Sequence, residues 1–442
     1  MAASLFDSPL YTQLFPTKDC GRLFSDSAAL RAMLLVEGAL AKVQGELGVI
    51  PAESAAAIHR ASLEIQIDPG ALAQSVGQNG VCLPGLLSAF RKEMNAPEHA
   101  QFVHWGATSQ DIMDSGLMLR LRQALVLAEA DLRRLIALLA AAADVHANQV
   151  MAARSYGQLA TPTSWGAVLA NWGMQAIDAL EELPALRAGA LWVSLSGAAG
   201  TGAALGPQAG QTRAGLAQAL GLGDPGRSWH TDRGPIMRIS DWMGRNVTLM
   251  AGFGQTLIDL AASGIQEVRL GGGGGSSTMP QKQNPVQPSV LVALGHQMAG
   301  VRAGLALGGA QRHQRDGAAW FTEWLLLPQI CLTHASALAQ SIDIATSLAP
   351  DAGRMAHTLT QSQGLVHAEA LSFALSQKMA RPLAQDETKS LCHKALETGS
   401  NLEDIARARH PDLPGDLFKD HSQMGQAPDA ARAFVARAKA LG

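Results

Sequence analysis

Residues 111–149, "DIMDSGLMLRLRQALVLAEADLRRLIALLAAAADVHANQ", are the strongest indication of the fold class. Apolar residues recur in this stretch every three or four positions over roughly ten helical turns. Strong helix formers fill the stretch, and no proline interrupts it. Helical periodicity of this length is typical of a coiled coil, a membrane helix or a bundle. The apolar positions are too irregular and too rich in alanine for strict heptads, which favours a bundle of long helices.

The same helical pattern returns through the middle of the chain, whereas period-two segments with hairpin turns are almost absent. Further long helices are expected over about 164–186, 235–270, 285–307 and 318–348.

On both sides of this region the helical patterns are shorter and are broken by proline and glycine. The sequence therefore predicts an all-α protein in three parts. These are an N-terminal helical domain, a central bundle of long helices and a C-terminal helical domain, over residues 1–110, 111–350 and 351–442.

The composition is that of a globular protein with a large core. Hydrophobic residues make up 47% of the 442 residues and charged residues only 16%, which favours an outer surface partly buried between subunits. The net charge is -3 and no basic block stands out, so nucleic acid is not an expected partner. The four cysteines lie far apart without CxxC spacing, which favours reduced thiols over disulfides or a zinc site.

No segment predicts secretion or membrane insertion. The N-terminus "MAASLFDSPLYTQLF" lacks a basic region followed by an apolar core. The apolar run at 135–143 is far shorter than the ~20 residues that span a bilayer. A soluble, cytoplasmic protein without a membrane partner is expected.

The segment "VHWGATSQDIMDSG", residues 103–116, contains the start of the first long helix. Thr108 and Asp111 fit the [ST]-x-x-[DE] capping box. A helix N-terminus with the hydroxyls of Thr108 and Ser109 is also suited to bind a carboxylate. His104 could donate to an anion there; the alternative is a packed histidine.

Two further segments place polar residues near expected helix ends. In "ARSYGQLATPTSWG", residues 153–166, glycine and proline mark a loop, and Gln158 is suited to hydrogen-bond a polar substrate. In "RSWHTDRGPIMR", residues 227–238, His230 lies just before a proline that fits a first helical turn. The alternative for this second segment is a loop with solvated charges. Arg315 precedes another long helix, where it could hold a carboxylate in bidentate fashion or be an ordinary surface arginine.

The segment "GGGGGSSTMPQKQNPV", residues 271–286, is unusual in a helical chain, because each glycine costs about 1 kcal/mol relative to alanine in a helix. Its spacing does not match G-x-x-x-x-G-K-[ST], so a nucleotide phosphate is not expected. We interpret the segment as a loop that closes over substrate, with Ser276 as a catalytic group and Lys282 as an electrostatic stabiliser. Asn284 before Pro285 fits a helix N-cap.

Together these motifs resemble the fumarase/aspartase superfamily, whose hallmark G-S-S-x-M-P-x-K-x-N-P stands complete at residues 275–285. The other two superfamily segments occur in the right order, as "GATSQD" and "RSYGQLATPT", so the resemblance covers nearly the whole chain. It implies three all-α domains, a homotetramer with a core of long helices, and active sites shared between three subunits. Neither a metal nor a cofactor is expected.

The resemblance also implies a chemistry. Members mostly remove a group β to a carboxylate through a doubly charged aci-carboxylate, which needs electrostatic stabilisation. Ser276 is implied as the catalytic base, and Lys282 as the partner of the carboxylate whose charge grows. The residues expected to bind the polycarboxylate substrate are His104, Thr108, Ser109, Tyr156, Gln158, His230, Asn284 and Arg315.

The sequence departs from the lyase pattern at two positions. Tyr156 stands where many lyases have the histidine of R-T-H-x-Q, and a phenol of pKa about 10 is a poor acid near neutrality. Asp316 follows Arg315 where a serine is expected, which bears on the local carboxylate-binding geometry.

The flanks "VHWGATSQDIMDSGLMLRLRQAL" and "WHTDRG" are similar to the bacterial 3-carboxymuconate cycloisomerases, in which another residue also occupies that histidine position. Lactonisation tolerates the change, because an ionised substrate carboxylate adds across a double bond and no leaving group needs an acid. The resemblance thus implies cycloisomerisation of 3-carboxy-cis,cis-muconate to 4-carboxymuconolactone in protocatechuate degradation. The alternatives are an adenylosuccinate-like or other succinyl-adduct lyase and a catalytically silent structural tetramer.

Overall fold

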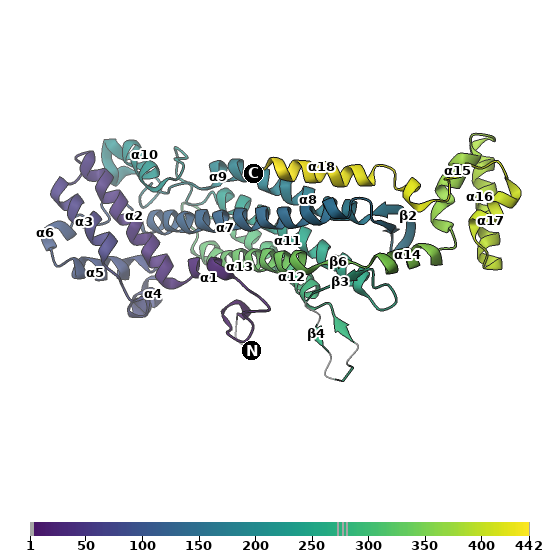
Figure 1. Ribbon diagram of the computed structural model, residues 1–442. Helices are drawn as coiled ribbons and strands as arrows, with labels where there is room; N and C mark the ends of the chain where they lie inside the picture. Colours follow the sequence, from purple (N-terminus) through teal and green to yellow (C-terminus); the bar gives the residue numbers. More distant parts are fainter. Residues whose placement is uncertain (1–3, 272–273, 276–277, 280–281, 442) are drawn as a thin grey trace. The chain divides into compact units, whose positions relative to one another are not determined.

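The computed structural model describes residues 4–271, 274–275, 278–279 and 282–441, and helices dominate it (Figure 1). The prediction of an all-α fold with long helices is therefore confirmed. The five longest predicted segments correspond to α7 (Ser109–Val145), α8 (Trp165–Glu181), α11 (Gly234–Ala261), α12 (Val286–Gly308) and α13 (Gly317–Ser347).

Two of the predicted helices end earlier than expected. The segment 164–186 is divided, because α8 ends at Glu181 and α9 (Leu183–Ala190) begins with a proline in its first turn. The segment 235–270 stops at Ala261, since Gly264 and Gln266 have the positive φ angles of 91° and 53° that end a helix.

The chain divides into two compact units, each built from three stretches of sequence. Unit 1 comprises residues 1–131, 179–248 and 293–339, and unit 2 comprises residues 132–178, 249–292 and 340–442. The long helices α7, α8, α11, α12 and α13 all contribute residues to both units. The division into three sequential domains stays a prediction.

Unit 1 combines short helices with parts of the long ones. The tightest pair is α2 and α3, where a Cβ on Gly38 would lie 1.9 Å from Ser62 Oγ, so glycine is required for this close approach. The shorter elements of unit 1 are η1 (Leu5–Asp7), α1 (Lys18–Leu23), α2 (Asp26–Glu46), α3 (Ala52–Glu64), η2 (Pro69–Leu72), α4 (Ala73–Asn79), α5 (Leu83–Met94), α6 (Pro97–Ala100), α9, η3 (Ala203–Gln208) and α10 (Ala209–Leu220).

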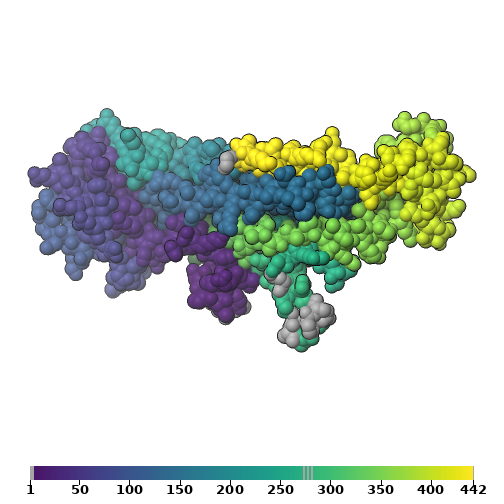
Figure 2. Space-filling model, viewed as in Figure 1, coloured from purple at the N-terminus to yellow at the C-terminus, as the bar shows by residue number. Residues whose placement is uncertain are grey.

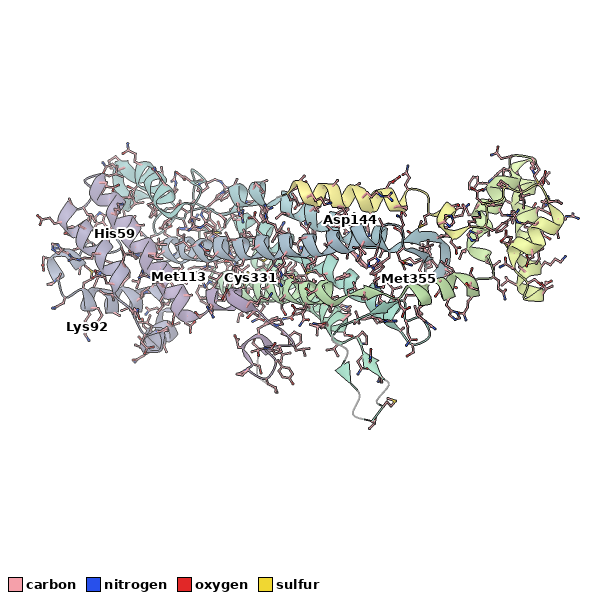
Figure 3. All side chains as sticks on the ribbon, in the orientation of Figure 1. His59, Lys92, Met113, Asp144, Cys331 and Met355 are labelled. Atoms are coloured by element: carbon pink, nitrogen blue, oxygen red, sulfur yellow. The ribbon has the colours of Figure 1, made fainter. Side chains whose placement is uncertain are left out.

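Figure 3 draws the side chains on the ribbon, and those buried in the interior of unit 1 are mostly apolar. Leu40, Ile58, Leu86 and Phe90 from α2, α3 and α5 are fully buried in one cluster, which extends to Ile112 in the first turns of α7. Burying a side chain of this size contributes about 1.5–3 kcal/mol. This core therefore fixes the start of α7 against the N-terminal helices.

Unit 2 ends in a set of short helices, drawn in yellow-green in Figure 2. These helices have a core of their own. Leu371, Leu375 and Leu391 are among its buried members. The elements found in unit 2 alone are β1 (Val150–Ser155), β2 (Gln158–Ser164), β3 (Val268–Arg269), β4 (Gly274–Gly275), β5 (Gln283–Asn284), β6 (Ala349–Pro350), α14 (Ala352–Gln361), η4 (Leu365–His367), α15 (Ala368–Leu375), α16 (Arg381–Thr398), α17 (Leu402–Arg409), η5 (Asp420–Gln423) and α18 (Ala427–Ala440).

The segment 153–166 is a β-hairpin rather than the expected loop. β1 and β2 pair antiparallel, with Val150 opposite Ser164 and Ser155 opposite Gln158. Tyr156 and Gly157 form the two-residue turn, and their φ angles of 52° and 73° are those of a type I′ turn. The expectation was wrong because Pro162 suggested a break, whereas a two-stranded ladder leaves an outer edge that tolerates proline.

Two helices, α12 and α13, are long and apolar enough to cross a membrane by length and composition alone. The apolar window of α13 is 72% buried, as in the core helix of a soluble protein, whereas that of α12 is only 28% buried. The four cysteines are free thiols, as the sequence predicted.

Candidate active site

The N-terminus of α7 is capped as the sequence predicted. Asp111 Oδ2 accepts a hydrogen bond from the backbone N–H of Thr108 at 3.0 Å, which is one half of a capping box. Thr108 and Ser109 therefore lie at the positive end of a 37-residue helix, where an anion is stabilised.

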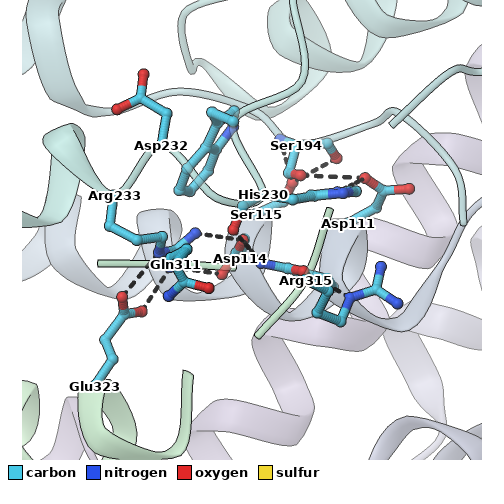
Figure 4. A network of polar contacts seen from close by, with 12 residues as sticks. Asp111, Asp114, Ser115, Ser194, His230, Asp232, Arg233, Gln311, Arg315 and Glu323 are labelled. Atoms are coloured by element: carbon cyan, nitrogen blue, oxygen red, sulfur yellow. Dashed lines mark hydrogen bonds and ion pairs between the residues drawn. The ribbon is translucent and has the colours of Figure 1, made fainter. Parts of the chain in front are cut away.

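Asp111 is a fully buried hub that holds three separate segments together (Figure 4). Besides Thr108, it accepts hydrogen bonds from Ser194 Oγ at 3.1 Å and from the backbone N–H groups of Ser196 and Gly197, both at 2.9 Å. His230 Nε2 lies 2.7 Å from Asp111 Oδ1. A carboxylate only accepts, so Nε2 carries the proton of the imidazole.

A buried ion cluster lies beside this hub (Figure 4). Arg233 donates to both oxygens of Asp114, at 2.9 and 3.1 Å, and to both oxygens of Glu323, at 2.8 and 2.6 Å. Burial opposes the charge of Arg233, but the two carboxylates outweigh it and raise its pKa. Burial also raises the pKa of Glu323. The side chains are at most 2% exposed, so the reading of 227–238 as a loop of solvated charges is wrong for Arg233.

Arg315 reaches the start of α7 through Gln110. Its Nε donates to Gln110 Oε1 at 2.8 Å, and its Nη2 makes longer contacts with Thr108 Oγ1 at 3.4 Å and Ala198 O at 3.3 Å. The structure thus brings the predicted residues Thr108 and Arg315 together.

Asp316, the departure next to Arg315, has partners of its own. Arg312 Nε donates to its Oδ2 at 2.5 Å, and its Oδ1 accepts from the backbone N–H of Ala318 at 3.1 Å at the start of α13. The hydrogen bond from Arg312 is the main cause that lowers the pKa of Asp316 to about 2. Asp316 therefore acts as a helix cap, and its charge is matched by Arg312 rather than by Arg315.

His104 lies in a left-handed conformation, with φ of 67°. Its Nδ1 is 2.7 Å from Oε1 of Glu37, a residue of α2 whose side chain is fully buried. Neither the carboxylate partner nor the backbone strain was expected from the sequence. The pair fixes the imidazole beside the segment that leads into Thr108.

The remaining predicted residues lie in unit 2. Tyr156 is fully exposed at the hairpin tip, and Gln158 follows it at the start of β2. Arg154 in β1 donates to both oxygens of the buried Glu267, at 2.8 Å each, which fixes one face of the hairpin. The motif R-S-Y-G-Q therefore spans the end of β1, the two-residue turn and the start of β2.

The signature segment is described in part. Ser276 lies outside the described residues, so the prediction for it is not tested. Gly274 pairs with Asn284 across β4 and β5, and Lys282 beside this ladder is exposed. A cavity of about 620 Å³ is lined by Lys282 and Asn284 together with Arg269, Asp351 and Arg354, among others.

Asn284 is not the helix N-cap that the sequence suggested. It lies in β5, and the carbonyl of Pro285 accepts the first helical hydrogen bond of α12, from Ser289 N at 3.0 Å. The cap is displaced by one residue because Asn284 pairs with Gly274 in the strand ladder, and α12 begins only at Val286.

The sequence reasoning missed Gln110, Asp114 and Glu323. All three lie in correctly predicted helices. From the sequence, Asp114 and Glu323 stand out only as members of a helical pattern, and Gln110 only as part of a helix start. A charged residue at an apolar position of a helix is the signal that indicates a buried ion pair. Asp114 and Glu323 both show that signal.

Several known proteins are similar to this chain over most of its length. The chain matches the family model described as "Lyase" over residues 16–300. A 3-carboxy-cis,cis-muconate cycloisomerase from Pseudomonas aeruginosa is 38% identical to it, over 98% of this chain and 96% of that protein. A nitrosuccinate lyase from Streptomyces davaonensis is 32% identical, over 92% of this chain and 88% of that protein. The crystal structure of a 3-carboxy-cis,cis-muconate lactonizing enzyme from Pseudomonas putida matches with a TM-score of 0.90 and 32% identity, over 98% and 99% of the two chains.

Proposed function

Because the chain belongs to this lyase family, the fumarase/aspartase superfamily, we propose that it converts 3-carboxy-cis,cis-muconate to 4-carboxymuconolactone. The observation that carries the proposal is the similarity, over nearly the whole chain, to a cycloisomerase and to a lactonizing enzyme. The reaction is an intramolecular addition, and in enzyme terms the protein is an isomerase.

In this reaction a substrate carboxylate adds across a double bond. The C–O bond forms, the electron pair of the double bond moves towards a second carboxylate, and the resulting aci-carboxylate is then protonated at carbon. Lys282 and Asn284 stabilise the growing charge in the proposal, since fixed donors are most effective where charge develops. Ser276 delivers the proton.

The start of α7 supplies the other half of the proposed site. Thr108 and Ser109 at the helix N-terminus and the guanidinium of Arg315 offer donors for a carboxylate that keeps its charge throughout. His104 is a further residue proposed to contact the substrate; its Nδ1 faces Glu37, which leaves Nε2 for that contact. His230 holds Asp111 and so supports the start of α7. Gln158 in unit 2 is a further residue proposed to bind the substrate.

The phenol at position 156 supports lactonisation over elimination. A phenol is a poor acid near neutral pH, and a lyase that expels an amine needs an acid for the leaving group. Cycloisomerisation has no leaving group. A second candidate, elimination from a succinyl adduct, is favoured by the similarity to lyases, among them the nitrosuccinate lyase.

We also propose a soluble, cytoplasmic homotetramer whose active sites combine residues from different subunits. Support comes from α12, an apolar helix whose window is only 28% buried. Leu307 on α12 and Leu325 on α13 are 78% and 74% exposed. Large apolar side chains on long helices are the surface that subunit association buries.

The test is a substrate panel with the purified protein, read by ultraviolet absorbance. We expect turnover of 3-carboxy-cis,cis-muconate and none of adenylosuccinate or argininosuccinate. Turnover of a succinyl adduct with no effect on the muconate would overturn the proposal in favour of the lyase. No turnover of any compound would favour a silent structural protein. Light scattering of the same sample tests the tetramer.

A further inference from the structure

We propose that Gln110 is a positioning residue that fixes the guanidinium of Arg315 for carboxylate binding. This inference rests on the function proposed above for the class of substrate, a polycarboxylate. Gln110 lies in the first turn of α7 and is only 1% exposed. Because it is buried, we expect Gln110 to act on the substrate only through its neighbours.

The partners of Gln110 determine which way its amide points. Nε2 donates to Asp114 Oδ2 at 3.2 Å and to the backbone carbonyl of His230 at 2.9 Å, and both of these groups only accept. Oε1 accepts from Arg315 Nε at 2.8 Å. A flipped amide would place its NH₂ group against the guanidinium and its oxygen against two acceptors. The chemistry of the partners therefore allows one orientation.

The support behind Gln110 is itself rigid. Asp114 Oδ2, which accepts from Gln110, also accepts from Arg233 Nη1 at 2.9 Å. Arg233 is held in turn by Glu323 of α13. These side chains are buried, and every bond but that of Gln110 is between charged groups. The position of the Gln110 amide is therefore set by α7, by the segment just before α11 and by α13 together.

This arrangement leaves one edge of Arg315 available. The residue is exposed, its Nε is anchored, and its Nη2 has only the longer contacts with Thr108 and Ala198. Nη1 has no hydrogen-bond partner in the part of the chain that the structure describes. A planar guanidinium fixed at Nε presents that edge in a constant direction beside Thr108. An exposed arginine without the anchor would lose rotamer freedom on binding, and this weakens affinity.

The experiment is steady-state kinetics of Gln110→Met, which keeps the length and burial of the side chain but removes all three hydrogen bonds. We expect KM for 3-carboxy-cis,cis-muconate to rise by about tenfold and kcat to stay within about threefold, because a ground-state carboxylate contact is weakened. Gln208→Met is the matched control. It removes a glutamine hydrogen bond to Leu47 O in the same unit, and its KM should not change. A loss in kcat with unchanged KM for Gln110→Met would overturn the proposal.

A double-mutant cycle separates positioning from a general packing effect. If Gln110 acts through Arg315, adding Gln110→Met to Arg315→Ala should change KM by less than about twofold. A further tenfold rise in the Arg315→Ala background would overturn the proposal. If Gln110→Met does not fold, Gln110→Asn tests the same contact, because its amide is one methylene too short to reach all its partners. Its KM should rise by about threefold, and an unchanged KM would count against the role.

Failure of the proposed function can be told apart from failure of this inference. If the wild-type protein does not turn over the muconate, the affinity for tricarballylate, an unreactive tricarboxylate, is measured by calorimetry instead. Weaker binding by Gln110→Met, with wild-type binding by Gln208→Met, would still support the role of Gln110. Equal affinities, or no binding by the wild type, would overturn it.

Discussion

The start of α7 and the signature segment 275–285 carry the two halves of the proposed chemistry on different supports. Around α7, Asp111, Asp114 and Arg233 are buried and each is held by several hydrogen bonds. Lys282, by contrast, is exposed beside the two-residue strands β4 and β5. The groups proposed for a constant carboxylate are thus preorganised within unit 1. Of the groups proposed for the developing charge, Lys282 is open to solvent and Asn284 is half-buried.

The largest expected effect comes from removing the centre of the buried cluster. Arg233→Met leaves Asp114 and Glu323 buried without their cation, and we expect a loss of about 3–5 kcal/mol in the free energy of unfolding. Urea denaturation measures it. Arg245→Met is the matched control, because Arg245 makes a bidentate pair with Glu182 at the surface and should cost at most about 1 kcal/mol. Equal losses in the two variants would show that burial of the cluster does not matter.

The next effect concerns the signature segment. Ser276→Ala removes the proposed proton donor, and we expect kcat to fall by about a hundredfold or more while assembly and thermal stability stay unchanged. Kinetics and light scattering check the two parts. Near-normal turnover would remove Ser276 from the mechanism and would mean that another group delivers the proton.

A smaller effect is expected on the pH dependence of stability. It comes from a buried histidine that, unlike His230, has no carboxylate partner. His230 has Asp111, whereas the hydrogen-bond partner of the fully buried His334 is the uncharged Asn246, at 3.3 Å. Burial lowers the pKa of His334 to about 3. Between pH 6.5 and 3 the unfolded chain therefore binds a proton that the native state does not, and stability falls as the pH is lowered.

The measurement is urea unfolding at pH 7.0 and 5.5 for the wild type and His334→Gln. The wild type should lose about 1.4 kcal/mol more than the variant over this interval, since one pH unit below the unfolded pKa contributes about that amount. Parallel losses would mean that His334 is protonated in the native state.

The smallest expected effect is that of Tyr156→His at the exposed hairpin tip. Lactonisation needs no acid at this position, so kcat should change by less than about threefold. The same kinetics with the muconate decide it. Complete loss of activity would show a positive role for the phenol and would weaken the contrast between cycloisomerase and lyase.

The sequence predicted the long helices because their periodicity is local. It also predicted the cap at Thr108 and Asp111, which depends on residues three apart. It failed at 153–166, where the choice between loop and hairpin depended on strand pairing, and at Asn284, where pairing with Gly274 displaced the cap. The hallmark at 275–285 indicated the superfamily directly, because a family motif can be recognised without its fold.

The helical fold, the family and the residue types at the site can therefore be inferred from the amino-acid sequence. The partners of the buried side chains emerge only when the chain is folded. Glu323 lies 90 residues from Arg233, and Arg315 lies 205 residues from Gln110. Neither pair has a local signal, since a hydrogen bond depends on distance in space rather than along the chain. Burial then determined their importance, because charges removed from water must find each other.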